Sequence, residues 1–379
     1  MGLVLAHPAH DPVYEGIREA FNSLGWVVCA IVPPHAQKEY TAWKQVYPNT
    51  HQCEVLEETL SEAEIPAAVA SRFGRTLDLI IYDDYKGRPE IFASVRSRCP
   101  LLLIAHNVRR ALQPIEGKGF QSIELNRPRR NGLRRLDGLL VLSDTIAQYA
   151  QEQFKPARPL LWIPDSVFYQ NLAFNENHNT PDARFTIAVP GNLTKERKDF
   201  PPVLKALAKL RTENRRRMNI RFIGGIGDES GKEIADELEA LKQDGVPLTY
   251  SRTMLTDLEF EEQMRGVDLL IQPVPQTVAV DGFLEEYNRT KISGTVGHQI
   301  RRGLPVLQPK WCPADQAFAS STGFYESAEE LLEILDRLFR EPAELAAQKE
   351  LALENARQFS PERIAKHIQE TILSSFSLD

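Results

Sequence analysis

Short apolar runs, separated by longer amphipathic stretches, recur along the whole chain. In the first half they lie at residues 3–6, 26–32, 77–82, 100–106 and 137–143. Continuous apolar runs of this length are typical of parallel strands that are buried on both faces. Helical spacing occurs between them, at residues 13–24, 61–73 and 143–154. This alternation predicts a doubly wound α/β domain over residues 1–168.

A second series of the same kind begins at residue 184. Its apolar runs lie at residues 184–191, 219–225, 246–252, 267–274 and 304–309, and a helical tail follows from residue 328. Residues 169–183 are rich in asparagine and lack apolar periodicity, which is typical of a linker. We therefore predict a second domain over residues 184–358. Residues 359–379 form a C-terminal helix that is a candidate to pack back on the first domain.

The predicted fold class is α/β, with two Rossmann-like domains facing each other across a cleft. Right-handed crossovers place the carboxyl ends of all strands of a parallel sheet at one edge. Ligands of such sheets bind at that edge. The polar side chains that directly follow the apolar runs are therefore the first candidates for a site.

Composition excludes several classes of protein. With 379 residues, 42% hydrophobic and 26% charged, the chain is too long for one hydrophobic core and too apolar for disorder. Its formal net charge of −7 argues against a general nucleic-acid binder, because such proteins normally carry a basic surface. The four cysteines lie far apart, a spacing that indicates neither a zinc site nor a disulfide framework. We expect a cytoplasmic protein with reduced thiols.

Four segments of the second half carry a resemblance to a known family. They are VPGNLTKERKDF (189–200), IRFIGGIGD (220–228), GVDLLIQPV (266–274) and EYNRTKISGTVGHQIRRGLPVL (286–307). In these segments the chain resembles the group 1 glycosyltransferases, the superfamily that includes glycogen synthase and has the GT-B fold. The resemblance implies transfer of a hexose from a nucleotide-diphosphate sugar to an acceptor hydroxyl, in polysaccharide or glycolipid synthesis, with retention of anomeric configuration.

The resemblance implies no cofactor apart from the nucleotide sugar, which is a co-substrate. The sequence has no Asp-x-Asp of the kind with which other transferases hold a divalent ion, and fixed cations can do the same electrostatic work. We therefore expect metal-independent transfer. The expected partners are a nucleotide sugar and a glycan or lipid-linked acceptor, and no nucleic acid.

A basic loop follows the strand that ends at Gly191, and a helix begins after this loop. A diphosphate needs fixed cations and free backbone N–H groups, and a basic loop that enters a helix N-terminus offers both. Arg197 and Lys198 are the candidates to bind the donor diphosphate. Gly191 and Asn192 match the opening of the family's phosphate loop. The alternative interpretation is a solvated, charged turn.

Residues 291–300 offer a second place for an anion. The small residues Ser293, Gly294 and Thr295 precede a helix and let a ligand approach the backbone amides. We predict that they contact the donor together with Lys291. The alternative is that the small residues only permit tight helix packing.

Many members of the family carry two glutamates eight positions apart in this segment. In this chain the two positions are Thr290 and His298, and neither is acidic. Glu286 and its neighbour Glu285 are the nearest candidates to reach the sugar hydroxyls.

Two further donor contacts follow from position in the family's order of elements. Gly225 lies in a glycine-rich turn at the end of a strand. Arg252 ends the next strand, where the family usually holds the base. A glycine cluster alone is weak support, because many such loops only turn.

Acidic and imidazole side chains end two strands of the first half. His106 follows the apolar run 100–106 and is a candidate to donate to a sugar hydroxyl or to orient the acceptor. Asp83 and Asp84 follow the preceding run and compete as the base that accepts the acceptor's proton. His7 is a weaker candidate. The alternative for each is a structural role.

The segment 109–135 is basic although the whole chain is acidic. It carries seven arginines and one lysine against two glutamates, a local balance of +6. We expect a basic, partly apolar loop that presents Arg109, Arg127, Arg130 and Arg134 to an anionic acceptor or to an anionic membrane at the inner face. The alternative is a solvated face that pairs with the acidic remainder of the protein.

Two other functions are compatible with the same fold. A sugar-nucleotide epimerase or hydrolase needs several acid–base groups around the sugar and no acceptor surface, so the basic segment counts against it. A non-catalytic binding or scaffold protein is the other alternative, since fold does not dictate function. The missing acidic pair favours it, and the phosphate-binding cations oppose it.

Overall fold

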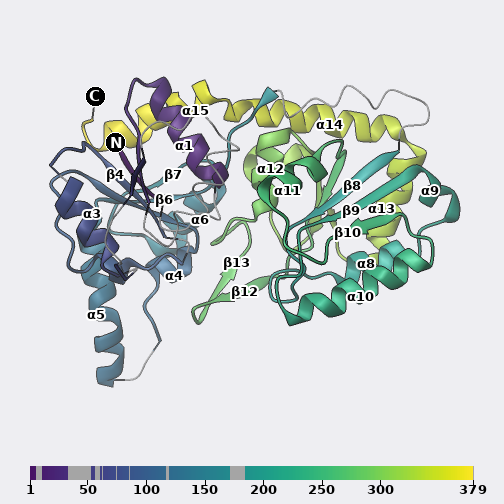
Figure 1. Ribbon diagram of the computed structural model, residues 1–379, viewed down its shortest axis with the longest axis horizontal. Coiled ribbons are helices and arrows are strands. Elements are labelled where there is room, and N and C mark those ends of the chain that lie inside the picture. The colour runs from purple at the N-terminus through teal and green to yellow at the C-terminus, as the bar shows by residue number, and fades with distance from the viewer. Residues whose placement is uncertain are drawn as a thin grey trace. The chain divides into compact units, whose positions relative to one another are not determined.

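Both units of the chain are built on a parallel β-sheet, as the apolar runs predict. The computed structural model describes residues 1–5, 11–32, 53–55, 60–61, 63–73, 75–84, 86–116, 119–170 and 184–378. They divide into two compact units (Figure 1). Unit 1 comprises Met1–Val167, Ala279–Ile292 and Phe359–Asp379, and unit 2 comprises Phe168–Val278 and Ser293–Gln358. Most of the predicted linker 169–183 lies outside the described residues, as do His7 and Lys118.

The sheet of unit 1 has seven parallel strands within the described ranges. In sheet order they are β3 (Cys53–Val55), β2 (Cys29–Val32), β1 (Gly2–Leu5), β4 (Ile80–Asp84), β5 (Leu101–Ala105), β6 (Gly138–Val141) and β7 (Leu160–Trp162). The chain reverses its direction of travel across the sheet between β1 and β4, which is the topological switch point. Every residue of β4, β5 and β6 is buried, and this explains the apolar sequence of β5, of β6 and of the first three residues of β4.

Helices and one hairpin surround this sheet. The elements of unit 1 are α1 (Asp11–Ser23), α3 (Ile65–Phe73), the 3-10 helix η3 (Pro89–Phe92), α4 (Val108–Leu112), α5 (Gly119–Arg135), α6 (Asp144–Phe154), β13 (Phe283–Glu286) with the second half of β12 (Thr277–Val280), α15 (Pro361–Ile368) and the π-helical turn η6 (Gln369–Leu373). α6 shows how the sequence sets a boundary: Ser143 caps its first turn by accepting a hydrogen bond from the backbone N–H of Ile146.

Unit 2 repeats the architecture with six parallel strands in the part of the chain that is described. In sheet order they are β10 (Leu248–Tyr250), β9 (Met218–Ile223), β8 (Phe185–Pro190), β11 (Leu269–Ile271), β14 (Val306–Pro309) and β15 (Thr322–Tyr325). Its helices are α8 (Pro201–Ala208), α9 (Thr212–Arg217), α10 (Glu229–Gln243), α11 (Asp257–Met264), α12 (Gly294–Arg302), η4 (Gln316–Ser321), α13 (Ala328–Arg340), α14 (Pro342–Ala356) and η5 (Arg357–Phe359). The switch point of this sheet lies between β8 and β11.

Successive residues of β11 enter two separate cores. Leu269 and Ile271 belong to the core that includes α8, α10 and α13, whereas Leu270 packs with Met264 of α11 on the opposite face. Because side chains alternate along a strand, this sheet is covered by helices on both faces. No helix in the described part of the chain is long and apolar enough to cross a membrane.

The hairpin β12–β13 corrects the predicted domain boundary. The sequence analysis placed residues 279–292 in the second domain, but they cluster with unit 1. The turn consists of Asp281 and Gly282, both with positive φ (47° and 84°), as a two-residue hairpin turn requires. The contacts that hold the hairpin on unit 1 come from α4, more than 170 residues earlier in the sequence.

The segment 109–135 was predicted to be a basic, partly apolar loop, but most of it forms α4 and α5. α5 contains Pro128 and Gly132, which disfavour a helix. Its inner side is fixed by packing on η3, and a Cβ added at Gly132 would lie 1.6 Å from the carbonyl oxygen of Pro89. Tertiary contact therefore overrides the local preference here.

The C-terminal segment Phe359–Asp379 belongs to unit 1, where α15 packs on α1. The ring of His367 lies 4.1 Å from the ring of Trp162, and its Nε2 is 2.9 Å from the carbonyl oxygen of the same residue. These contacts attach the end of the chain to the edge strand β7.

Candidate functional site

The loop after β8 lies at the switch point of the unit 2 sheet. The backbone N–H of Asp199, at the end of this loop, donates to the carbonyl oxygen of Pro273, which follows β11 (2.8 Å). Leu193 is held by the glycine-rich turn after β9, because its N–H donates to Gly225 and its carbonyl accepts from Gly227. Thr194 donates to Asp228, the N-cap of α10 (2.5 Å). The basic loop is thus fixed at both ends.

Lys198 is the most unusual cation of this loop. Its ammonium is half-buried and donates to the carbonyl oxygen of Pro190 (2.9 Å). It has no carboxylate partner among the described residues. Burial lowers the pKa of Lys198 to about 8. A Cβ added at Gly191 would lie 3.2 Å from the ammonium, so the glycine gives the lysine room.

Several other polar residues of this loop are more exposed than Lys198. Arg197 and Asn192 are exposed, as expected of residues that meet a solvent-borne ligand. Lys195, also exposed, pairs with Glu233 of α10. Lys198 is therefore the only one of these three cations that is both half-buried and paired with a carbonyl group alone.

His298 on α12 lies within electrostatic range of Lys198. Burial is the main cause that lowers the pKa of His298, to about 3, and the charges of Arg302, Arg301 and Lys198 lower it further. Its imidazole is therefore uncharged at neutral pH. The ring stacks on Phe260 of α11.

The first turn of α12 presents backbone groups one helical turn before His298. Ser293 is the N-cap and accepts from the N–H of Thr295 (3.3 Å). Gly294 is exposed, and a Cβ added there would meet no atom within 4 Å. The hydroxyl of Thr295 is buried and has no hydrogen-bond partner among the described residues. This helix start, which the sequence analysis singled out, is thus open to a ligand and favourable for an anion.

Gly225 and Arg252 have structural partners. A Cβ at Gly225 would lie 2.5 Å from the backbone of residues 253 and 254, so the glycine is explained by the close approach of two loops. Arg252 pairs with Asp236 (3.1 Å) and lies over the ring of Tyr250. Their contacts with a donor remain a prediction.

In unit 1 the carboxyl ends of β4 and β5 bring Asp83 and His106 together. Nε2 of His106 lies 2.6 Å from Oδ1 of Asp83, and both side chains are buried. Oδ2 of Asp83 has no hydrogen-bond partner within the described residues. A carboxylate that orients an imidazole is an arrangement that can accept a proton.

Asp84 is not available as a base, contrary to one of the two alternatives in the sequence analysis. Its carboxylate pairs with the guanidinium of Arg88 (2.8 and 3.1 Å) and accepts from the backbone N–H of the same residue (2.6 Å). With both oxygens engaged and the side chain fully buried, Asp84 fixes the turn after β4.

The hairpin supplies the cap of α4. The carboxylate of Glu285 accepts from the backbone N–H groups of Arg110 (2.7 Å) and Arg109 (3.2 Å). Burial raises the pKa of Glu285. The N-cap residue Asn107 instead accepts from the ammonium of Lys291 (2.9 Å). Glu285 is therefore not free to reach a sugar, which corrects the expectation from sequence.

Glu286 and Lys291, both predicted to contact the donor, lie with unit 1. Glu286 pairs with Arg109 and, through its second oxygen, with Arg289 (2.8 Å). Arg109 is thereby neutralised and half-buried, so it does not belong to an exposed basic patch. Donor contacts of Glu286 and Lys291 remain a prediction.

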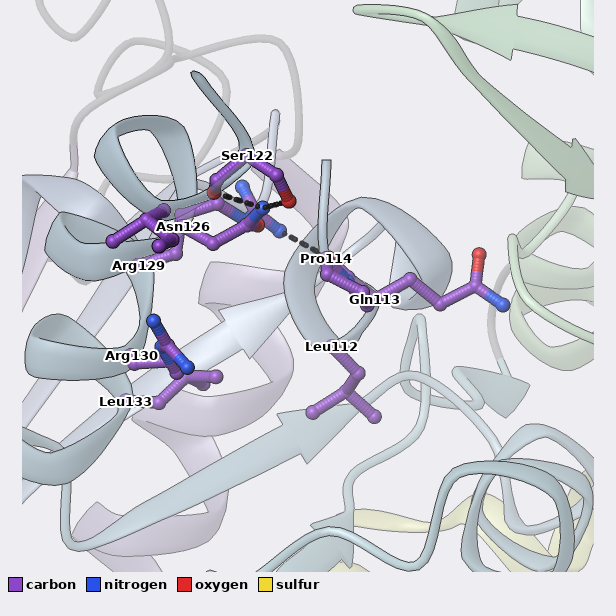
Figure 2. A pocket seen from close by; sticks show the side chains of 9 residues that line it. Leu112, Gln113, Pro114, Ser122, Asn126, Arg129, Arg130 and Leu133 are labelled. Carbon is purple, nitrogen blue, oxygen red and sulfur yellow. Dashed lines mark hydrogen bonds between the residues drawn. The ribbon is translucent and has the colours of Figure 1, made fainter. Parts of the chain in front are cut away.

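A hollow of about 400 Å³ lies between α4 and α5 (Figure 2). Its lining is largely apolar, with Leu112, Pro114 and Leu133, and Arg130 stands at it as a cation. No prediction from sequence identified it, because its two walls come from helices that were expected to be a loop.

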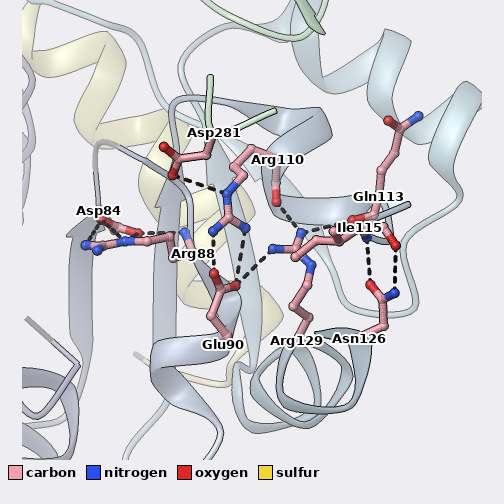
Figure 3. A network of polar contacts seen from close by, with 9 residues as sticks. All are labelled: Asp84, Arg88, Glu90, Arg110, Gln113, Ile115, Asn126, Arg129 and Asp281. Atoms are coloured by element: carbon pink, nitrogen blue, oxygen red, sulfur yellow. Dashed lines mark hydrogen bonds and ion pairs between the residues drawn. The ribbon is translucent and has the colours of Figure 1, made fainter. Parts of the chain in front are cut away.

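The inner arginines of α4 and α5 form an internal network (Figure 3). The carboxylate of Glu90 on η3 binds both Arg110 and Arg129, and Arg129 also donates to the carbonyl oxygens of Arg110 and Gln113. Asn126 donates to and accepts from the backbone of Ile115. These arginines hold the helices together and do not contribute to a surface charge. Among the described residues, no group of three or more His, Cys, Asp or Glu side chains is placed to hold a metal ion.

No protein-family model matches the chain, and no curated protein matches it significantly. Solved structures match it over the full length. HepE of Anabaena, in complex with UDP, matches over 98% of this chain and 99% of its own, with 16% identity and a TM-score of 0.64. Sucrose-phosphate synthase of Thermosynechococcus elongatus matches over 100% and 99%, with 14% identity and a TM-score of 0.62.

A glycosyltransferase of Rickettsia africae matches over 100% of this chain and 98% of its own, with 13% identity and a TM-score of 0.61. These likenesses confirm the predicted fold class: the chain has the GT-B fold. Membership in group 1 of the glycosyltransferases stays a prediction from the resemblance of the four segments.

Proposed function

We propose that this GT-B chain is a glycosyltransferase that moves a sugar from a nucleotide-diphosphate sugar to an acceptor hydroxyl. The full-length likeness to HepE, to sucrose-phosphate synthase and to the Rickettsia transferase supports this activity. The observation that carries the proposal is Lys198, a half-buried ammonium at the switch point of the unit 2 sheet.

A cation in this position destabilises the unliganded protein. Desolvation opposes the charge, and among the described residues no carboxylate compensates for it. Groups whose pKa is shifted by desolvation inside a binding edge are concentrated at functional sites. A bound diphosphate supplies the missing negative charge. The unfavourable desolvation of Lys198 in the free protein is then offset in the complex, which increases the affinity for the diphosphate.

The diphosphate is also the leaving group of the proposed reaction. When the bond between the anomeric carbon and the phosphate oxygen breaks, negative charge accumulates on that oxygen. Lys198, Arg197 and the open start of α12 at Gly294 provide two cations and backbone N–H groups to stabilise it. Groups that are fixed before a reaction begins require little reorganisation during it, and the contacts of Lys198 and of its loop support this role.

The acceptor hydroxyl loses a proton as its oxygen bonds to the anomeric carbon. The pair of His106 and Asp83 is the group in unit 1 that is suited to receive this proton. At the end of the reaction the proton resides on the His106–Asp83 pair, the sugar is bonded to the acceptor oxygen, and the nucleoside diphosphate departs with the electrons of the broken bond. We expect the anomeric configuration to be retained, and NMR of the first product decides this.

Binding of nucleotides to the full chain tests the donor site. Thermal shifts are measured with UDP, GDP, ADP and their glucose derivatives, beginning with UDP because structures of HepE contain UDP and glucose. Ligand at about 100 times its dissociation constant should add about 2.7 kcal/mol to the stability of the folded state. Lys198→Met and Arg197→Ala should lose the response.

Lys205→Met is the matched control, because Lys205 is an exposed lysine of α8, the helix that follows the same loop. It should respond to nucleotide as the wild type does. A panel in which no nucleotide stabilises the wild type contradicts the proposal. Binding without transfer or hydrolysis of the sugar instead supports the non-catalytic alternative.

A further inference from the structure

One side of α5 carries five exposed side chains at intervals of three and four residues. They are Phe120, Ile123, Arg127, Arg130 and Arg134. This spacing places them on a single face of a helix. Phe120 is 72% exposed and Ile123 is 55% exposed. We name these five side chains the outer face of α5.

The outer face is distinct from the buried side of α5. The buried residues of α5 are Asn126, Arg129 and Gly132, and they face η3 and α4. Within the described residues, Arg127, Arg130 and Arg134 form no ion pair with an acid, unlike Arg109, Arg110 and Arg129. Glu124 is the one acid of α5. The face is therefore both apolar and cationic.

The two kinds of side chain are ordered along the helix axis. The apolar residues lie in the N-terminal part and the three arginines follow toward the C-terminal end, over about 21 Å at 1.5 Å per residue. In the view of Figure 1, α5 extends away from the strands of unit 1, with its N-terminal end farthest from them. The apolar end is thus the part of the helix that reaches outward.

This order matches the layers of an anionic phospholipid surface. Aromatic and aliphatic side chains enter the boundary between headgroups and acyl chains, while arginines stay at the level of the phosphates. A guanidinium binds a phosphate with two parallel hydrogen bonds. A soluble polyanion offers nothing to Phe120 and Ile123, and an apolar protein groove offers nothing to three arginines.

The hollow between α4 and α5 continues from this face. Ile123 and Arg130 belong to both, and the apolar walls of the hollow include Leu112 and Leu133 (Figure 2). A lipid phosphate bound to Arg130 therefore has apolar surface directly beside it. This continuity gives a phospholipid two sets of contacts that a flat charged surface lacks.

From these observations we infer that α5 docks unit 1 on an anionic phospholipid membrane, with Phe120 and Ile123 in the interface and Arg127, Arg130 and Arg134 on lipid phosphates. The inference goes beyond the proposed transferase activity, because docking requires neither donor nor acceptor. Failure of one therefore leaves the other standing.

Co-sedimentation of the full chain with vesicles tests this inference. Binding is compared between vesicles of phosphatidylcholine alone and vesicles that also contain phosphatidylglycerol. We expect binding to the anionic vesicles only, with weakening as salt is raised. Each arginine of the outer face changed to Gln should reduce the partition coefficient about fivefold. Phe120→Ser with Ile123→Ser should also reduce it.

A matched triple variant controls for net charge. Arg75, Arg98 and Arg135 are exposed arginines of unit 1 outside the outer face, and their change to Gln should leave binding nearly unaltered. It is compared with the variant in which Arg127, Arg130 and Arg134 are all changed to Gln. Equal losses in these two triple variants would overturn the inference, since net charge alone would then explain binding. Absence of wild-type binding to the anionic vesicles would overturn it as well.

Two further measurements separate docking from misfolding and from a soluble ligand. Phe120→Trp, which leaves the arginines intact, should add fluorescence that shifts to the blue when anionic vesicles are present. Polyphosphate replaces the vesicles in a parallel titration. The inference is wrong, and the partner is a soluble anion, if two results are found together. Polyphosphate binds as tightly as the vesicles do, and the double variant Phe120→Ser, Ile123→Ser binds both polyphosphate and vesicles as the wild type does.

Discussion

The imidazole of His298 stacks on the ring of Phe260, with centroids 5.1 Å apart and planes inclined by 22°. Burial and the charges of Arg302, Arg301 and Lys198 lower the pKa of His298 to about 3. The position corresponds to one of the family's two glutamates, so a neutral ring stands where the resemblance implies a carboxylate. A neutral imidazole can donate one hydrogen bond and accept another, and it adds no charge to the cations around it.

Acid should destabilise the chain through His298. In the unfolded chain His298 binds a proton below pH 6.5, whereas in the folded protein it does so only near pH 3. The unfolded state therefore binds more protons across this window, and stability falls as pH decreases, by up to about 1.4 kcal/mol per pH unit. His298→Phe, which keeps the stack, should therefore lose less stability between pH 7 and pH 5 than the wild type does, as measured by urea unfolding. An unchanged pH dependence contradicts the assigned pKa.

Nucleotide affinity should fall as pH rises above 8. The ammonium of free Lys198 has a pKa of about 8, and a bound diphosphate must raise that pKa because it favours the charged form. Binding above pH 8 therefore requires uptake of a proton, at a cost of up to about tenfold in affinity per pH unit. Titration calorimetry with UDP at several pH values between roughly 7 and 10 measures this affinity, because lysine side chains with such a pKa lose their proton in this range.

Lys198→Arg is the informative companion to this titration. Arginine keeps the positive charge throughout this pH range. Its affinity for the nucleotide should stay level where that of the wild type declines. A parallel decline in both proteins would assign the effect to another group.

Asp83→Asn should separate catalysis from donor binding. The substitution removes the carboxylate that orients His106 through a contact of 2.6 Å, and the donor groups of unit 2 are untouched. We expect kcat to fall by roughly 10² to 10⁴, the usual contribution of a positioned acid or base, with the nucleotide Kd unchanged. Steady-state kinetics and calorimetry provide the two readouts.

Asp84→Asn is the contrasting variant. Its carboxylate is engaged with Arg88, so the expected loss is in thermal stability. If Asp84→Asn lowers kcat and Asp83→Asn does not, the roles of the two aspartates are the reverse of those proposed.

Most strands of both sheets could be predicted from sequence, because burial of a strand on two faces produces a short, continuous apolar run. The runs ending at His106 and Gly191 each end within one or two residues of an observed strand. His106 and Asp83 were both named, and the parallel pairing of β4 with β5 brings them together. The rule that strand ends share one edge was sufficient for this part of the site.

Contacts between distant segments explain what the sequence could not show. Glycine at position 132 disfavours a helix, and the reason for it is the close approach of the carbonyl group of Pro89, which leaves no room for a Cβ. Glu285 was a candidate for sugar binding because nothing nearby reveals that its partners are the N–H groups of Arg109 and Arg110. One signal was present, since Asp281-Gly282 between alternating residues is typical of a hairpin turn.

Gly132→Ala should destabilise unit 1 although alanine favours helices. The added Cβ would lie 1.6 Å from the carbonyl oxygen of Pro89, a backbone atom that can move only with η3. We expect a loss of at least about 2 kcal/mol from overpacking, measured by urea unfolding. Gln121→Ala, at an exposed position of the same helix, should be neutral or slightly stabilising. Equal stability of the two variants would contradict the close packing of α5 on η3.

Glu285→Ala tests whether the hairpin is held on unit 1 by the cap that it provides to α4. The substitution leaves two backbone N–H groups, those of Arg109 and Arg110, without their acceptor in a buried place. Each buried donor left unsatisfied costs about 1 to 3 kcal/mol, so for two donors we expect a loss of about 2 to 6 kcal/mol. Glu285→Gln keeps one acceptor oxygen and should lose about half as much.

Glu286→Ala is the matched control on the neighbouring residue. Its carboxylate pairs with Arg109 and Arg289 in a half-buried setting and caps no backbone group, so its loss should stay near or below about 1 kcal/mol. Urea unfolding gives the energies, and limited proteolysis after Arg289 reports directly on release of the hairpin. Rapid cleavage in Glu285→Ala with slow cleavage in Glu286→Ala is the expected pattern. If both variants are cleaved alike, the ion pairs and not the helix cap attach residues 279–292 to unit 1.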